Sequence, residues 1–80
     1  MIRFVKIFNS KITGYWYFPE NNKAPGMIEI NTKTGDVDIV IESILDQELE
    51  YPIYANKAKS YVKRLFDSGD MPDEENLVWY

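Results

Sequence analysis

The side chains that most enzymes use near neutral pH are missing from this sequence. Its 80 residues include no histidine and no cysteine. Zinc sites with nitrogen or sulfur ligands, and Ser-His or Cys-His nucleophiles, are therefore excluded. Acid–base chemistry would require a carboxylate or a lysine with a strongly shifted pKa, and a small domain rarely supplies the necessary burial. We therefore expect no enzyme, no catalytic residue, no cofactor and no metal site.

Two carboxylates have a spacing that could nevertheless do chemistry. Asp36 and Asp38 are two residues apart on a predicted strand, so both point to one face, as half a metal site would require. A solvated outer face that alternates with buried Val37 and Ile39 predicts the same spacing. The acidic stretch 67–75 lacks the ligand spacing of a calcium loop and is typical of a polar connection. We favour the solvated interpretation of both segments.

A run of four aromatic residues, Tyr15 to Phe18, is the other candidate for function. In a strand, Tyr15 and Tyr17 point to one face, and Trp16 and Phe18 point to the other. If one helix covers only one face of the sheet, one of these pairs is exposed or is covered by another segment. Exposed aromatic side chains on a sheet can stack on bases or anchor a protein partner. A core role is the alternative, because a small domain needs its aromatic residues for stability.

Several strand-like segments must position these candidates. Turn-forming residues at 19–26 and 31–36 separate runs rich in β-branched and aromatic residues. These runs predict an antiparallel meander. The closing residues are too apolar for a free tail, and we expect Leu77 and Trp79 to dock. The expected strands cover residues 2–8, 15–18, 27–31 and 37–41, with a possible last strand at 76–79.

A helix over residues 53–67 is the clearest single element. Its apolar residues fall within one arc at about 100° per residue, while four cations lie on the other side. Gly69 suits the C-terminal cap. A shorter helix is expected after Ser43, which would cap it with Asp46 three residues on. We expect this short helix to direct three side chains inward, those of Ile44, Leu45 and Leu49. The four cations are Lys57, Lys59, Lys63 and Arg64.

The predicted fold is a single α+β domain spanning residues 1–80. An antiparallel meander of three to five strands packs against the amphipathic helix at about residues 53–67, because the sheet is the only apolar surface large enough to receive it. The predicted core contains residues from the strands and from the helix. It comprises Phe4, Ile28, Ile30, Val37, Ile39, Ile41, Ala58, Val62, Leu65 and Phe66.

The composition also indicates the cellular compartment of the protein. The lack of cysteine favours a reducing compartment. No stretch approaches the 18 or so apolar residues of a membrane span. We therefore expect a cytoplasmic protein that does not enter a membrane. The abundance of lysine over arginine, with many Ile, Asn, Tyr and Phe residues, is typical of an AT-rich genome such as that of a low-GC bacterium or its phage.

The leading functional hypothesis is a small non-catalytic protein-interaction module. It would act through an aromatic or acidic surface, on another protein or on a second copy of itself. The candidate surface comprises Tyr15, Tyr17, Asp36 and Asp38. The alternative is a nucleic-acid-binding module that uses exposed sheet aromatics and the N-terminal cations. A net charge of −4, with acidic blocks on either side of the basic helix, disfavours nucleic acid.

Overall fold

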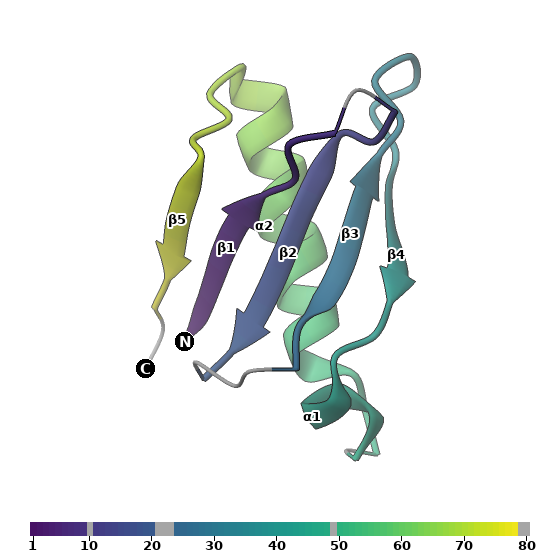
Figure 1. Ribbon diagram of the computed structural model, residues 1–80, viewed down its shortest axis with the longest axis vertical. Coiled ribbons are helices and arrows are strands. Elements are labelled where there is room, and N and C mark those ends of the chain that lie inside the picture. Colours follow the sequence, from purple (N-terminus) through teal and green to yellow (C-terminus); the bar gives the residue numbers. More distant parts are fainter. Residues whose placement is uncertain (10, 21–23, 49, 79–80) are drawn as a thin grey trace.

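The computed structural model contains a five-stranded antiparallel sheet with one long helix packed on it (Figure 1). This arrangement confirms the predicted α+β fold. The structure describes residues 1–9, 11–20, 24–48 and 50–78. The sheet order is β4-β3-β2-β1-β5. Strands β1 to β4 form the meander, and β5 pairs with the remaining side of β1. The elements are β1 (Ile2–Lys6), β2 (Gly14–Pro19), β3 (Gly26–Ile30), β4 (Val37–Ile41), α1 (Ile44–Gln47), α2 (Ile53–Ser68) and β5 (Glu74–Leu77).

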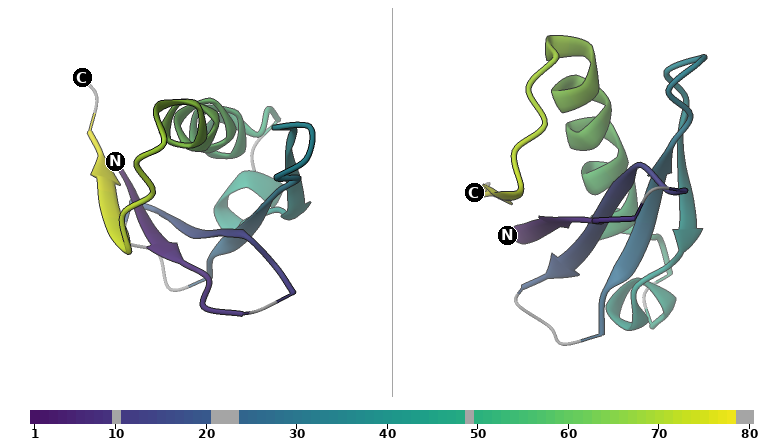
Figure 2. Two further views of the ribbon diagram at one scale, coloured as in Figure 1. Left: turned by 90° about the horizontal axis from the view of Figure 1, so that it is seen from above. Right: turned by 45° about the horizontal axis from the view of Figure 1, so that its top comes forward.

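The long helix covers only one face of the sheet. Both views of Figure 2 show α2 on one side, and in Figure 1 it lies behind the strands. Small residues on α2, Ala55 and Ala58, are buried and let the helix approach the strands closely. Between the two layers lies the hydrophobic core. Its buried members are Ile2, Phe4, Tyr15, Tyr17, Ile28, Ile30, Val37, Ala55, Ala58 and Val62.

The ends of α2 are set by different devices. Gly69 closes the helix in a left-handed conformation with φ 76°, and its N–H donates to the carbonyl of Phe66 at 3.1 Å. The predicted C-terminal cap is therefore confirmed. At the other end, Pro52 has no side-chain hydrogen bond to offer. The carboxylate of Asp46 in α1 instead accepts from the N–H of Tyr54 at 3.0 Å, and so supplies the missing cap.

The predicted cap of α1 is also present, and it is buried. The hydroxyl of Ser43 accepts from the N–H of Asp46 at 3.2 Å and donates to its carboxylate at 2.9 Å. Ser43 is fully buried and Asp46 is 1% exposed. A buried carboxylate needs several hydrogen-bond donors, and these bonds hold Asp46 in place. The short helix α1 is therefore stabilised by tertiary contacts, because a helix of this length is not stable by itself. Ile44, expected to face inward, is 49% exposed.

One predicted core residue, Ile41, is 46% exposed, and the pairing of β4 explains why. Ile28 pairs with Ile39, but Met27 pairs with Ile41, so β4 has one extra residue between these pairs. A bulge of this kind shifts the alternation of side chains. Ile41 therefore joins the face of Met27, which is the face away from α2. The other predicted core residues are buried or partly buried.

Three further expectations concern the ends and turns of the chain. The last strand begins two residues earlier than predicted, and Leu77 packs half-buried against the core. Trp79 and Leu49 lie outside the described residues, as does the centre of the turn at 19–26. The backbone of Leu45 lies in α1, but its side chain is likewise outside the description.

Candidate functional site

The aromatic run of β2 divides between the two faces of the sheet. Tyr15 and Tyr17 are fully buried under α2, so they are not part of the interaction surface that the sequence suggested. The hydroxyl of Tyr15 donates to the carbonyl of Pro72 at 2.6 Å, and that of Tyr17 donates to Asp46 at 3.1 Å. The Tyr17 hydroxyl also accepts from the N–H of Ser43. Burial raises the pKa of both tyrosines to about 12.

Trp16 and Phe18 lie instead on the other face, which we call the open face. Among the residues that the structure describes, no helix covers it, and it is turned toward the viewer in Figure 1. Strand pairing places Trp16 opposite Val5 on one side and opposite Met27 on the other, and Met27 opposite Ile41. Directly opposed residues share a face, so these side chains form one apolar row across four strands. We call this set of side chains the apolar row, and it comprises Val5, Trp16, Met27 and Ile41.

Arg3 is the only cation that the described strand residues direct to the open face, and it is already engaged. Its guanidinium lies over the ring of Phe18, 4.8 Å from the centroid. It also forms an ion pair with Glu74 at 3.5 Å. A cation held against a ring and a carboxylate is less available to an approaching anion.

Two carboxylates lie beside the apolar row. Glu29 and Asp38 are directly opposite each other in the pairing of β3 with β4, and both are exposed. Opposed like charges destabilise a sheet by a few tenths of a kcal/mol to about 1 kcal/mol. Within residues 1–9, 11–20, 24–48 and 50–78, neither forms an ion pair. The open face is therefore apolar along one row and anionic along the next.

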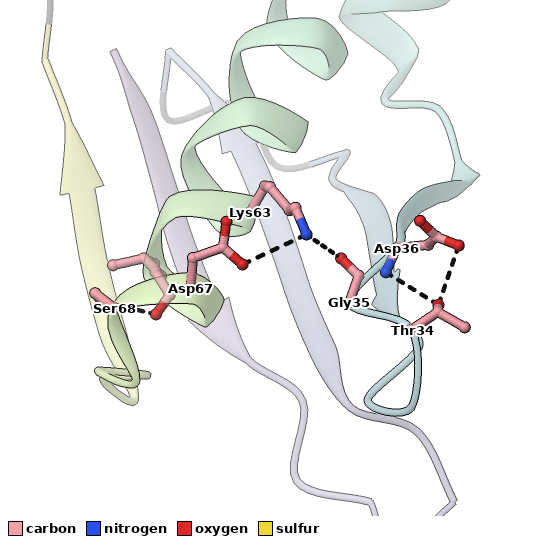
Figure 3. A network of polar contacts seen from close by, with 7 residues as sticks. Thr34, Gly35, Asp36, Lys63, Asp67 and Ser68 are labelled. Carbon is pink, nitrogen blue, oxygen red and sulfur yellow. Dashed lines mark hydrogen bonds and ion pairs between the residues drawn. The ribbon is translucent and has the colours of Figure 1, made fainter.

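Asp36, the other predicted surface acid, has a local structural role. Its carboxylate accepts from the hydroxyl of Thr34 at 3.0 Å, and its N–H donates back to that hydroxyl at 3.2 Å (Figure 3). Asp36 and Asp38 are both exposed, as predicted, and they share a face. The structure thus brings the two acids together but separates them from Tyr15 and Tyr17, which point into the core.

The outer edge of β4 is guarded against further strand pairing. Lys63 reaches from α2 and donates to the carbonyl of Gly35 at 2.7 Å, and it also pairs with Asp67 at 3.4 Å (Figure 3). Val37, the first residue of β4, is only 5% exposed. Covered backbone groups, charged residues and a bulge are devices that blunt sheet edges.

The cations of α2 flank two shallow hollows. One lies between α2 and β4 and is lined by Asp36, Val37, Asp38, Lys59, Ser60 and Lys63, so Asp38 borders both this hollow and the open face. The other lies between α2 and β5, where the Arg64 guanidinium is 5.7 Å from the centroid of the Tyr61 ring. Both hollows are open to solvent, unlike the enclosed clefts in which small ligands bury most of their surface.

No metal or membrane signal accompanies these surfaces. In the part of the chain that the structure describes, no three His, Cys, Asp or Glu residues gather as a metal site would require. Among the same residues, no helix combines the length and apolar character needed to span a bilayer. Comparison with protein families, with curated proteins and with solved structures finds no match. The functional argument therefore rests on the open face itself.

Sequence reasoning identified the β2 aromatics but chose the wrong pair for the surface. Hydropathy alone favours burial of Trp16 and Phe18 over two tyrosines. The structure buries the tyrosines because their hydroxyls find partners in Asp46, Ser43 and the carbonyl of Pro72. The burial of Asp46 would have indicated that the tyrosines face inward, but that burial depends on the fold and cannot be predicted from the sequence.

Proposed function

We propose that the protein is a non-catalytic module that binds another protein through the open face of its sheet. The observation that carries the proposal is the apolar row, which crosses four strands on the face of the sheet that lies opposite α2. A sheet of a small domain normally buries its apolar face against another layer. Here Trp16, Phe18 and Met27 remain partly exposed, and Ile41 is 46% exposed.

We propose the cytoplasm as the location, because the chain has no cysteine.

Nucleic acid is the weaker candidate for this face, although Trp16 and Phe18 could stack on bases. Glu29 and Asp38 would repel a phosphate backbone, and Arg3 is engaged with Glu74.

Site-specific photo-crosslinking in the cells that make the protein tests the proposal. A benzoylphenylalanine at Phe18 places the reactive ketone on the open face, and the same residue at Lys59 places it on the exposed side of α2. We expect a discrete protein adduct from position 18 and none from position 59. The adduct should survive nuclease and disappear when Met27→Asp adds a charge to the apolar row.

The controls separate binding from folding. Met27 is partly exposed, so Met27→Asp should leave the far-UV circular dichroism unchanged, and Met27→Gln provides an uncharged second variant. Equal adducts from positions 18 and 59 would contradict the proposal. A nuclease-sensitive adduct at position 18 would instead assign the open face to nucleic acid.

A further inference from the structure

We infer that the segment bound by the open face is an amphipathic helix of a partner protein that carries lysine or arginine along one flank of its apolar stripe. This inference rests on the proposed function and specifies the chemistry of the partner. It follows from three features of the open face: the length of the apolar row, the two carboxylates beside it, and the guarded edge of the sheet.

The apolar row has the length of a short helical stripe. Val5, Trp16, Met27 and Ile41 lie on four adjacent strands. At about 4.8 Å between strands, the row is roughly 14 Å long. A helix rises about 1.5 Å per residue, so about ten residues of a partner helix would cover the row. Such a helix presents apolar side chains at i, i+3, i+4 and i+7, which form a stripe of this kind.

The carboxylates determine the charge of the flank. Glu29 lies two residues from Met27 along β3, which places it about 7 Å from the apolar row, and Asp38 lies directly opposite Glu29 on the bulged strand β4. A helix about 10 Å in diameter, seated on the row, would hold its flanking side chains above this acidic pair. Lysine or arginine there would relieve the repulsion between two opposed carboxylates, whereas an acidic flank would increase it.

The β1 end of the apolar row does not favour an acidic partner. Glu74 is opposite Val5, and it is paired with Arg3. The strand residues of the open face thus hold three acids against one cation, namely Glu29, Asp38 and Glu74 against Arg3. A basic partner therefore meets a face of opposite net charge.

The guarded edge disfavours a strand added beside β4, and a strand added at either edge, β4 or β5, would leave the apolar row uncovered. Lys63 already donates to the carbonyl of Gly35, Val37 is nearly buried, and a bulge interrupts β4 near Val40. A second copy seated face to face would bring its own Glu29 and Asp38 against those of the first, or against its apolar row. The charges therefore favour a different protein over self-association.

Three synthetic 18-residue amphipathic helices test the inference. They share one leucine stripe and differ only in the flank, which is lysine, glutamine or glutamate. Trp79→Phe removes the second tryptophan of the chain, so fluorescence then reports Trp16 alone. We expect the lysine helix to bind about tenfold more tightly than the glutamine helix, and the glutamate helix to bind least.

Neutral variants connect this preference to the acidic pair. The double variant Glu29→Gln/Asp38→Asn should reduce the tenfold preference for lysine to about onefold and leave binding of the glutamine helix unchanged. Glu48→Gln/Asp70→Asn changes the net charge equally at exposed residues outside the strands and should keep the preference.

Each outcome decides between the two claims. If the lysine and glutamine helices bind equally, the basic flank is overturned and the open face remains a binding site. The same conclusion follows if the preference survives the Glu29→Gln/Asp38→Asn change. If none of the three helices alters Trp16 fluorescence, this inference fails, and the crosslink from position 18 decides separately whether the open face binds a protein.

Discussion

The two faces of the sheet use their aromatic residues in opposite ways. Under α2, Phe4 is fully buried, its ring stacks on Tyr61 at 5.3 Å, and Tyr15 and Tyr17 satisfy their hydroxyls within the protein. On the open face, Phe18 is partly exposed beside Arg3. The difference teaches that α2 stabilises one face, while the aromatics of the other face contribute less to folding and remain available for contact.

A matched pair of truncations gives the largest expected effect. Phe4→Ala removes a fully buried ring and should lower the free energy of unfolding by about 3–5 kcal/mol. Phe18→Ala removes a partly exposed ring and should cost about 1 kcal/mol. Urea denaturation measures both.

The stability of so small a domain is only about 4–12 kcal/mol, so Phe4→Ala could leave little folded protein. Phe4→Leu then gives a smaller loss in the same direction. Equal losses at positions 4 and 18 would show that the open face is as important for folding as the covered one.

The buried carboxylate gives the next largest effect. In Asp46, Oδ2 accepts from the hydroxyls of Tyr17 and Ser43, and Oδ1 accepts from the N–H of Tyr54. Asp46→Asn replaces one of these oxygens by an amino group, which cannot accept. We expect a loss of about 2 kcal/mol in the free energy of unfolding. Asp67→Asn, at an exposed acid paired with Lys63, is the control and should cost less than about 0.5 kcal/mol. A loss at Asp46 no larger than at Asp67 would contradict the capping role.

Alkaline pH should affect the covered face. The pKa of a tyrosine in the unfolded chain is near 10, and burial raises the pKa of Tyr15 and Tyr17 to about 12. Between these values the unfolded chain has lost the protons that the folded chain retains. Stability is therefore intact below pH 10 and falls as pH rises toward 12, on the order of 1 kcal/mol for each tyrosine by pH 11.

Urea denaturation at pH 9 and pH 11 measures this fall. Tyr17→Phe removes one of the two tyrosines whose pKa is raised to about 12 and should reduce the difference between the two pH values. The same stability at both values would mean that the hydroxyls are not protected by the fold.

The smallest expected effect has the opposite sign. Asp38→Asn removes one of two opposed carboxylates on the open face and should raise the free energy of unfolding by a few tenths of a kcal/mol. Thermal unfolding at low ionic strength detects the change, which added salt should diminish. A destabilised Asp38→Asn variant would show that this acid has a folding role, and would weaken the case that the acidic pair is kept for a partner.

Local patterns predicted most of the fold. The apolar arc of residues 53–67 and Gly69 located α2, and Ser43 located the start of α1, because periodicity and caps are properties of short segments. The orientation of β2 was not predictable in this way. Tyr17 faces inward because Asp46, 29 residues later, receives its hydroxyl, and Ile41 faces outward because of a bulge that depends on pairing with β3. Both depend on contacts between distant residues.

The pairing of β5 with β1 also has a consequence for synthesis. β1 ends at Lys6, but its second neighbour begins at Glu74. At about 5–20 residues per second, a ribosome needs several seconds to make the chain between them. Throughout that interval one side of β1 exposes unpaired backbone groups next to an apolar sheet. Until residues 74–77 have been made, that side of β1 is open to pairing with another strand.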